Sequence, residues 1–286
     1  MKTTTEVLKK EKKTNLLKSL GPVEELEAHV HPEWWRYIFN ALYIKTDGDV
    51  VEDEEITKNE VDIFLNILNI ETGVKILDVC GGQGRHSFEL CKRGFVNIEG
   101  IDRSSYLINK ARNRNRENHF SIKFREGDAR KLPYHESSFD VVMLLGNSFG
   151  YFESADDDIQ VLLSVSKILK PGGKLLIDIA DGDFLKNNYK PRSWEWINNN
   201  HFVCRERCLS SNGKKLISRE VITQTDKGVI ADQFYSESLY DKSALENIVH
   251  LSGFKNVKIM SGYEVKSKRN QDLGMMENRL ILMANS

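Results

Sequence analysis

The stretch VKILDVCGGQGRHSFEL, residues 74–90, decides how this chain folds. A short apolar run leads into three glycines within four residues, at positions 81, 82 and 84, and a pattern with helical spacing follows them. A glycine turn between a first strand and a first helix brings the backbone close to a bound nucleotide-type cofactor. The stretch therefore predicts such a turn, and its ligand stays open between a nicotinamide dinucleotide and S-adenosylmethionine.

Strand-like and helix-like segments alternate on either side of this turn. The alternation predicts a doubly wound parallel sheet with helices on both faces. The expected strands are residues 75–79, 97–101, 122–126, 141–145 and 174–179, and the expected helices are residues 84–93, 105–115 and 157–169.

Residues 193–240 interrupt this rhythm with alternating segments, which are joined at Asn212-Gly213 and at residues 226–228. Asn-Gly between two strand patterns is a strong hairpin signal. We therefore expect an antiparallel meander inserted into the parallel core. A helix near residues 242–254 and two strands near 256–265 and 277–285 then complete the core.

The N-terminal part of the chain predicts helices. Residues 1–20 are typical of a lysine-rich surface helix. A second helix is expected over residues 32–44, with Pro32 at its start. A third is expected to begin at Thr57, because Glu60 three residues later completes a capping-box pattern.

Composition indicates a globular, cytoplasmic protein. The 286 residues carry a formal net charge of −1, so no overall field attracts nucleic acid or a membrane surface. No segment has the pattern of a signal peptide or the roughly 18 apolar residues of a membrane span. Four cysteines are too few for a disulfide framework. Cys204 and Cys208, with His201 nearby, fit no common zinc spacing, so we expect no metal.

The acids around the glycine turn narrow the choice of cofactor. No glycine follows Gly84 at the third position of the dinucleotide fingerprint. Asp78, Asp102 and Asp128 stand at the ends of successive strands, where carboxylates can accept hydrogen bonds from an ammonium, ribose hydroxyls or an amino group. Together with the FDVV strand and the LKPGG turn, this ordered set resembles the class I S-adenosylmethionine-dependent methyltransferases over residues 73–180 and 241–286.

That resemblance implies an α/β, Rossmann-like sheet of seven strands with an antiparallel last strand. It divides the chain into an N-terminal helical lid over residues 1–72 and a cofactor-binding core over 73–192. An inserted antiparallel β subdomain, over residues 193–240, would cover the substrate or form a homodimer. Residues 241–286 would complete the core.

The resemblance also implies a cofactor site, residue by residue. Asp78 and the backbone from Cys80 to Gly84 hold the methionine part, Asp102 holds the ribose, and Asp128 with Ala129 holds the adenine. Cys80 stands where the family most often has its first glycine. The full set of expected contacts is Tyr43, Asp78, Cys80, Gly81, Gly82, Gly84, Asp102, Arg103, Asp128, Ala129 and Leu145.

The segment LLGNSFGYFES, residues 144–154, follows the fourth strand, where open α/β sheets bind ligands. It is similar to the Gly-Asn-Ser-Phe run of glycine N-methyltransferases, which implies that Asn147 orients the methyl acceptor. The alternative is that Asn147 caps the next helix and Phe149 belongs to the core. We expect catalytic roles for Asn147, Tyr151 and His86, and acceptor contacts from Asn147, Phe149, Arg192, Trp194 and Arg269.

Three of these candidates have an ordinary structural alternative. Arg192 can be a surface arginine, Trp194 a residue buried in the inserted sheet, and His86 a packing or capping residue. Arg269 lies in a polar loop that needs no function.

These residues predict an enzyme that transfers a methyl group from S-adenosylmethionine to a small molecule, preferably to an amine nitrogen. The alternatives are a small-molecule O-methyltransferase, an RNA or protein methyltransferase, a non-catalytic S-adenosylmethionine-binding protein and a nicotinamide-dependent dehydrogenase. The neutral charge balance weighs against RNA.

Overall fold

The computed structural model describes residues 21–265 and 276–286, which form two sheets. The larger sheet is built from β1 (Ile76–Val79), β2 (Ile98–Asp102), β3 (Lys123–Glu126), β4 (Phe139–Leu144), β5 (Leu169–Ala180), β10 (Lys255–Glu264) and β11 (Asn278–Asn285). The smaller sheet is built from β6 (Arg192–Asn198), β7 (His201–Leu209), β8 (Lys215–Gln224) and β9 (Gly228–Ser238). The helices are η2 (Leu26–His29), η3 (Trp34–Arg36), α2 (Ala41–Thr46), α3 (Gly48–Val51), α4 (Glu54–Leu68), α5 (Arg85–Lys92), α6 (Ser105–Glu117), η4 (Ala129–Lys131), α7 (Ala155–Ile168), α8 (Gly182–Asn188) and α9 (Lys242–Leu251).

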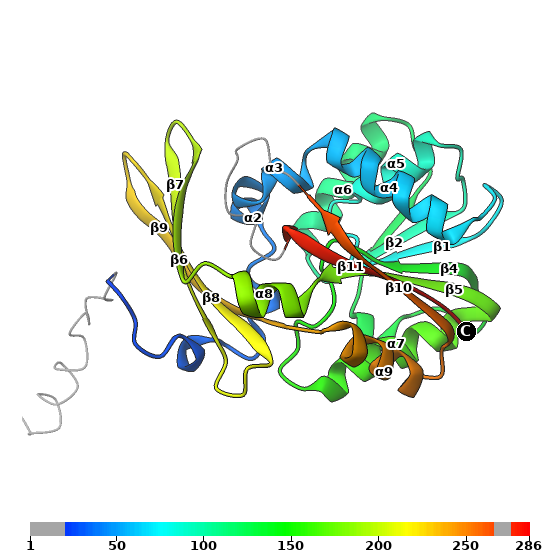
Figure 1. The fold of residues 1–286 in the computed structure, drawn as a ribbon. Coiled ribbons are helices and arrows are strands. Elements are labelled where there is room, and N and C mark those ends of the chain that lie inside the picture. The colour runs from blue at the N-terminus through cyan, green and yellow to red at the C-terminus, as the bar shows by residue number, and fades with distance from the viewer. Residues whose placement is uncertain (1–20, 266–275) are drawn as a thin grey trace, which may run out of the picture.

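The seven-stranded sheet has the order β10-β11-β5-β4-β1-β2-β3, and β11 runs antiparallel to both of its neighbours. The predicted Rossmann-like sheet with an antiparallel last strand is confirmed. Helices α4, α5 and α6 cover one face, and α7 and α9 cover the other (Figure 1). The inserted sheet lies beyond one end of this core, with α2 between the two (Figure 1).

The core has two apolar layers, one on each face of the large sheet. In β1, Ile76 packs with Phe88 of α5, whereas its neighbour Leu77 packs in the other layer with Leu162 of α7 and Leu245 of α9. All five side chains are almost completely buried. Burial on both faces explains why the parallel strands are continuous apolar runs in the sequence.

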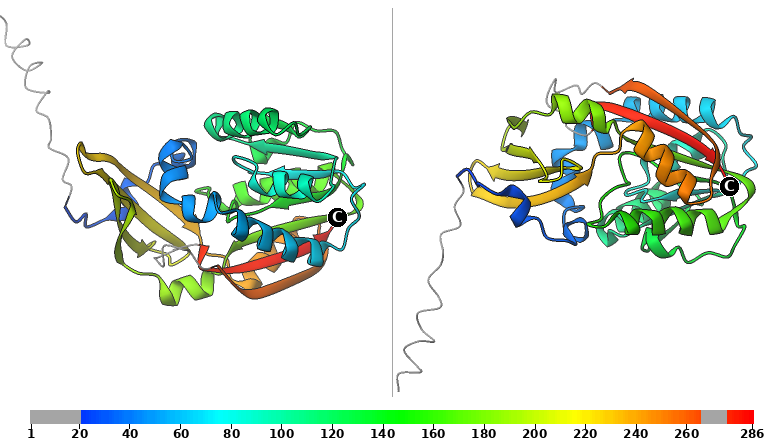
Figure 2. Two further views of the ribbon diagram at one scale, coloured as in Figure 1. Left: turned by 90° about the horizontal axis from the view of Figure 1, so that it is seen from above. Right: turned by 60° about the horizontal axis from the view of Figure 1, so that its bottom comes forward.

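The inserted meander is a four-stranded antiparallel sheet with the order β6-β7-β8-β9, as predicted. Its inner face is polar and buried: Arg205 lies opposite Glu220, and Glu220 lies opposite Gln233. Its outer face carries Trp194, which is 66% exposed. The N-terminal segment runs along this sheet (Figure 2), and the ring of His29 stacks on that of Phe234.

The prediction of one helix over residues 32–44 was wrong. A 3-10 turn, η3, is followed by a separate helix, α2, because the Asn40 side chain accepts a hydrogen bond from the Leu42 amide and starts the helix there. In η3, Trp34 and Trp35 are buried, and their rings contact Tyr151 and Phe152.

The predicted capping box at Thr57 was also wrong. Helix α4 begins at Glu54, and Asp53 is its cap, accepting from the Glu55 and Ile56 amides. Glu60 is therefore free of a capping role and lies fully buried, facing Arg85, His86 and Arg279. Residues 1–20, where a surface helix was predicted, lie outside the described residues.

Gly182 lies where helix α8 contacts the backbone that connects β9 to α9. Its amide donates to the Tyr240 carbonyl oxygen at 3.0 Å, and a Cβ at this position would lie 2.6 Å from the Leu239 carbonyl carbon. Backbone atoms cannot move aside as a flexible side chain can. Gly182 is thus required where α8 crosses the connection from β9 to α9.

We expect Gly182→Ala to lower the free energy of unfolding by about 1–3 kcal/mol through overpacking. Gly73→Ala is the matched control, since no atom lies within 4 Å of a Cβ at Gly73. Urea unfolding followed by circular dichroism measures both. Equal stabilities of the two variants would contradict this account of Gly182.

Candidate active site

A cavity lies at the carboxyl ends of β1 to β4, where the glycine turn meets the lid. Its lining comes from the turn (Cys80, Gly82), from the ends of β2 and β3 and the segments after them (Asp102, Arg103, Ser104, Gly127, Asp128, Ala129), from the segment after β4 (Gly146, Ser148, Phe149, Tyr151, Phe152), from α6 and α7 (Leu107, Val161) and from the lid (Trp35, Phe39, Tyr43). We call it the cofactor cavity. It brings together most of the residues predicted to hold the cofactor.

Asp102 fixes the glycine turn from the end of β2. One carboxylate oxygen accepts the Gly82 amide at 2.8 Å, and the other accepts the Ser104 amide at 2.7 Å. Burial raises the pKa of Asp102, and these hydrogen bonds oppose that effect. Each oxygen can accept a further hydrogen bond, as a carboxylate that binds a diol requires.

Asp78 lies beneath the turn and is not part of the cavity wall. One of its oxygens accepts from the Ser87 hydroxyl at 2.6 Å, whereas Oδ1 is buried and has no hydrogen-bond partner among the described residues. A Cβ on Gly81 would lie 2.7 Å from this carboxyl group, so only glycine fits above it. Burial raises the pKa of Asp78 to about 6.

Of three further residues predicted to hold the cofactor, Asp128 lines the cavity, whereas Gly84 and Leu145 do not. Asp128 lines the cavity, but both of its oxygens are held by Arg130, at 3.1 and 2.7 Å. Gly84 caps α5, and a Cβ there would lie 2.7 Å from the Phe124 ring, so it serves packing. Leu145 is buried in the core and does not line the cavity.

A second cavity lies between the lid and the inner face of the inserted sheet, and we call it the acceptor cavity. Phe39, Tyr43, Gly146 and Tyr151 line both cavities, so the two meet at these residues. The other lining residues are Trp34, Ile38, Thr46, Asp47, Asp49, Val50, Val51, Asn147, Glu195, Arg205, Arg207, Ser218, Glu220, Gln233, Tyr235, Glu237 and Met276.

Asn147 connects the core to the acceptor cavity. Its Nδ2 donates to Glu237 Oε1 at 2.9 Å, and its Oδ1 accepts the Ala180 amide at 3.0 Å. The next helix, α7, is capped by Ser154, so the alternative role of Asn147 as a helix cap was wrong. Burial raises the pKa of Glu237 to about 8, and nearby Asp47 adds to the effect.

His86 belongs to a buried ion network and lines neither cavity, which corrects its assignment as a catalytic residue. Its Nε2 lies 2.8 Å from Glu60 Oε2. Burial lowers the pKa of His86 to about 4, and Arg85 contributes to this. His86 is thus a neutral imidazole that pairs with Glu60 of α4. This structural role accounts for its place after the glycine turn.

Arg192 and Trp194 lie on the outer face of the inserted sheet, away from both cavities. Strand residues alternate between faces, and Glu195, one position on, is the β6 residue that reaches the acceptor cavity. Arg192 lies 3.5 Å from Glu206, and Trp194 is largely exposed. The prediction of acceptor contacts from these two residues is therefore withdrawn. Arg269 lies outside the described residues.

Two comparisons identify the family. The sequence matches a family profile described as a methyltransferase domain over residues 76–173. A demethylmenaquinone methyltransferase of Lactobacillus johnsonii is 33% identical over 200 residues, which make up 68% of this chain and 74% of that protein. The chain belongs to the class I S-adenosylmethionine-dependent methyltransferases. The resemblance found in the sequence is thereby confirmed.

Other relatives of this methyltransferase match over shorter stretches. A demethylmenaquinone methyltransferase of Deinococcus radiodurans is 38% identical over 104 residues, 36% of this chain and 42% of that protein. The chain thus spans about two fifths of the length of the first curated relatives it matches. A solved S-adenosylmethionine-dependent methyltransferase of Clostridium acetobutylicum has a TM-score of 0.66 at 18% identity, over 85% of this chain and 96% of that one.

The cofactor cavity of this methyltransferase has the features that S-adenosylmethionine requires. The turn at Gly81 and Gly82 leaves a cradle that side chains would fill, and the orphaned Asp78 Oδ1 lies beneath it. Asp102 presents a carboxylate to the cavity, as ribose hydroxyls require. We propose that Cys80, Arg103, Ala129 and the other predicted residues that line the cavity contact the cofactor.

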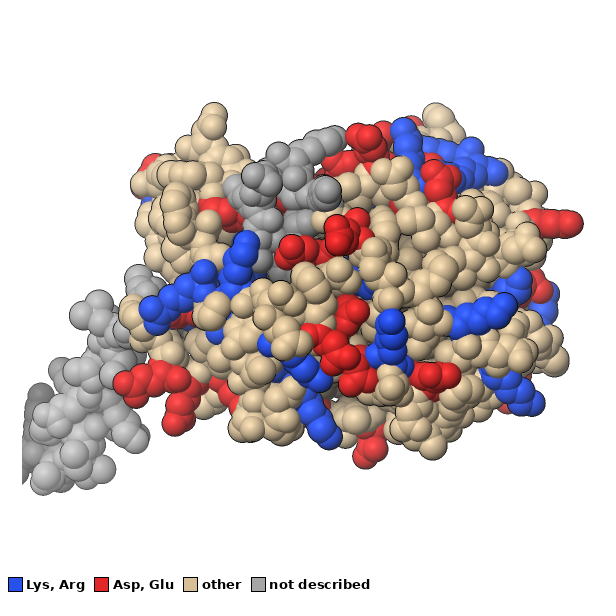
Figure 3. All heavy atoms as spheres, in the orientation of Figure 1, with Lys and Arg blue, Asp and Glu red and all other residues tan. Residues whose placement is uncertain are grey.

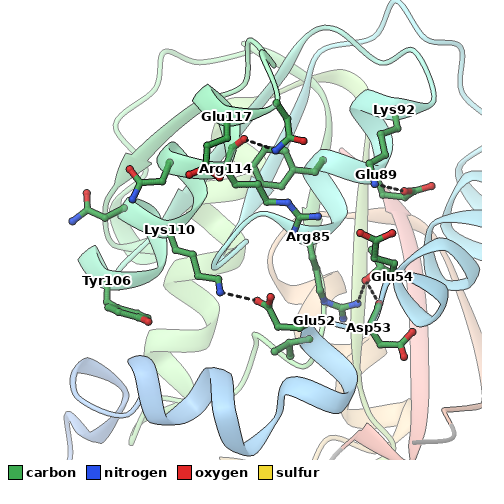
Figure 4. A pocket seen from close by; sticks show the side chains of 16 residues that line it. Glu52, Asp53, Glu54, Arg85, Glu89, Lys92, Tyr106, Lys110, Arg114 and Glu117 are labelled. Carbon is green, nitrogen blue, oxygen red and sulfur yellow. Dashed lines mark hydrogen bonds and ion pairs between the residues drawn. The ribbon is translucent and has the colours of Figure 1, made fainter. Parts of the chain in front are cut away.

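A third hollow, larger than the two cavities, lies between α4, α5 and α6 (Figure 4). Its charged side chains pair with one another, as Lys110 does with Glu52 at 3.3 Å. On the face in Figure 3, acidic and basic residues are interspersed. Within the described ranges, no helix is long and apolar enough to cross a membrane, and no group of three potential ligands can hold a metal ion.

Sequence reasoning missed the acids of the acceptor cavity, above all Asp47, Glu220 and Glu237. The sequence offers no clear signal for them, because both faces of β7 to β9 mix polar and apolar residues: Arg219 and Asp232 lie on the face opposite to Glu220.

We expect Asp102→Ala to weaken binding of S-adenosylmethionine by about 1.5–3 kcal/mol, because charged hydrogen bonds are lost and the glycine turn loses its anchor. Isothermal calorimetry measures the affinity. Asp62→Ala, which removes a carboxylate that is 61% exposed, is the control and should bind normally. Unchanged affinity in Asp102→Ala would exclude Asp102 from the cofactor site.

We expect Glu237→Gln to stabilise the methyltransferase above neutral pH. The folded-state pKa of Glu237, about 8, lies above the usual value of 4.5, so wild-type stability falls as pH rises between these values. Since a tenfold change in proton affinity corresponds to about 1.4 kcal/mol, the variant should gain at least about that much at pH 8 and little at pH 4.5. Urea unfolding across this pH range measures the difference in stability between the variant and the wild type. Equal pH dependence of the two would show that Glu237 titrates normally.

Proposed function

We propose that this methyltransferase transfers its methyl group to the amine nitrogen of a small, polar acceptor that arrives positively charged. The observation that carries the proposal is the excess of acids in the acceptor cavity. Five carboxylates line it, Asp47, Asp49, Glu195, Glu220 and Glu237, against two guanidinium groups, Arg205 and Arg207.

Buried acids in excess are costly unless a cation joins them. Burial raises the pKa of Asp47 to about 6, and Glu220 adds to that effect, so Asp47 resists ionisation beside a second carboxylate. A bound ammonium would compensate the excess negative charge. A neutral acceptor would leave it uncompensated, and for this reason the cavity favours an amine over a hydroxyl.

The junction between the two cavities supports transfer from one to the other. Bound S-adenosylmethionine would supply an electrophilic methyl group. Tyr43, Phe39 and Tyr151 wall the junction with aromatic rings, and Phe39 and Tyr151 stack with centroids 5.6 Å apart. Such a wall excludes water and attracts positive charge through its ring faces.

Methylation of a quinone ring carbon is the second candidate, because demethylmenaquinone methyltransferases are among the relatives. The aromatic wall of Trp34, Phe39 and Tyr151 would suit a flat ring. The buried carboxylates suit it less well, since the reduced quinol ring that can attack the methyl group offers them hydroxyl donors but no positive charge to balance the excess of acids.

Incubation with methyl-labelled S-adenosylmethionine tests the proposal. The panel contains amino acids, amino sugars, polyamines, hydroxylated analogues of each and a short-chain demethylmenaquinone that is kept reduced to its quinol. We expect label on nitrogen of at least one amine, located by mass spectrometry, and none on its hydroxylated analogue. Label confined to the quinone ring or to oxygen would reject the proposal.

A further inference from the structure

Glu237 differs from the other acids of the acceptor cavity in having a buried oxygen that lacks a hydrogen-bond partner among the described residues. It lies on β9, and the residue is 7% exposed. Its Oε1 accepts the hydrogen bond from Asn147, whereas Oε2 is buried and has no hydrogen-bond partner among the described residues. An unmade hydrogen bond in a buried carboxyl group is costly, so its presence in a cavity points to a ligand.

Other acids of this cavity are already engaged. Glu220 accepts from Arg205 Nε at 2.7 Å and from Gln233 Nε2 at 3.0 Å, through different oxygens. Asp47 accepts from the Thr46 hydroxyl at 2.6 Å. Glu195 lies 3.0 Å from the Arg205 guanidinium.

Asn147 holds Glu237 in one orientation. Because Asn147 Oδ1 accepts the Ala180 amide, Nδ2 must be the atom that faces Glu237. The backbone amide of Asn147 donates to the Asp178 carbonyl oxygen at 2.9 Å, which anchors the whole residue to β5. Asn147 is thus a positioning residue for Glu237.

We propose that Glu237 Oε2 binds the acceptor's ammonium group and takes the proton that the nitrogen must lose before methyl transfer. The inference rests on the proposed function. One N–H bond breaks and its proton passes to Oε2, which leaves a lone pair on nitrogen. That pair forms the new bond to the methyl carbon as the carbon–sulfur bond breaks, and the electrons of that bond stay on sulfur. The product leaves as a methylated ammonium, and Glu237 returns its proton to water.

The surroundings of Glu237 suit a base that works near neutral pH. Asp47 from the start of α3 and Glu220 from β8 face it and favour its neutral form, whereas Arg207 from β7 favours the carboxylate. Three tyrosines, Tyr43, Tyr151 and Tyr235, surround it as well. A carboxyl group whose pKa lies close to the working pH both accepts and releases a proton readily.

Sinefungin provides a test that needs no knowledge of the acceptor. This analogue of S-adenosylmethionine carries an amine-bearing carbon in place of the methyl-bearing sulfur, so its ammonium lies where the two cavities meet. We expect the wild-type protein to prefer sinefungin over S-adenosylhomocysteine, and the preference to rise between about pH 6.5 and 8 as Glu237 ionises. Glu237→Gln should lose about tenfold in sinefungin affinity at pH 8 and keep its affinity for S-adenosylhomocysteine.

Asp158→Asn is the matched control. Asp158 is a buried carboxyl group with a pKa raised by burial to about 7, it accepts from Tyr240, and it lines neither cavity. Both affinities should be unchanged in this variant. Glu237→Ala is a second test variant, and retained binding of S-adenosylhomocysteine shows that either Glu237 variant is folded. A sinefungin preference that survives both, or that is lost in Asp47→Asn and kept in Glu237→Gln, overturns the inference.

The two proposals fail separately. If amines are methylated while Glu237→Gln retains the pH-dependent preference for sinefungin, the role of Glu237 is wrong and the proposed function stands. If Glu237→Gln loses that preference but only ring carbon or oxygen is labelled in the acceptor panel, the proposed function is wrong, and with it the proton transfer from an amine.

Discussion

One buried guanidinium, that of Arg279, links the parts of the structure on which the site depends. It lies on β11 with no exposed surface and pairs with Glu60 of α4 and with Asp178 of β5, the latter at 3.0 Å. Asp178 also accepts the Gly146 amide at 2.9 Å, and Gly146 lies where the two cavities meet. The Arg279 side chain therefore joins strand β11, helix α4 and the turn at Gly146.

Such a network is a poor source of net stability, since apolar residues of similar volume often replace buried ion pairs without loss. The network instead fixes the positions of the groups that it binds. Although burial alone would raise the pKa of Glu60, Arg85 and Arg279 hold it well below the usual range, so this carboxylate stays ionised. The arrangement holds Gly146 and Asn147 in left-handed backbone conformations that an apolar core could not anchor through hydrogen bonds.

The sequence predicted what depends on local pattern. The order of strands and helices, the hairpin at Asn212-Gly213 and the place of Asp102 beside the glycine turn follow from periodicity and turn chemistry. The acceptor cavity could not be predicted, because polar and apolar residues are mixed on both faces of the inserted strands, and no periodicity shows which face the rest of the chain covers. Trp194 was misplaced for the same reason: nothing in β6 itself shows that its face is the exposed one.

The acids on the inner face of the inserted sheet bear on its purpose. A sheet that only covered the core would have an apolar inner face, because buried acids oppose folding. The inserted sheet instead presents Glu220 and Glu237 to a cavity that borders the cofactor cavity, and Asn147 connects Glu237 to the backbone of β5. Arg205 already pairs with Glu220, so Glu237 is the acid whose burial a cation would offset if the proposed acceptor binds there.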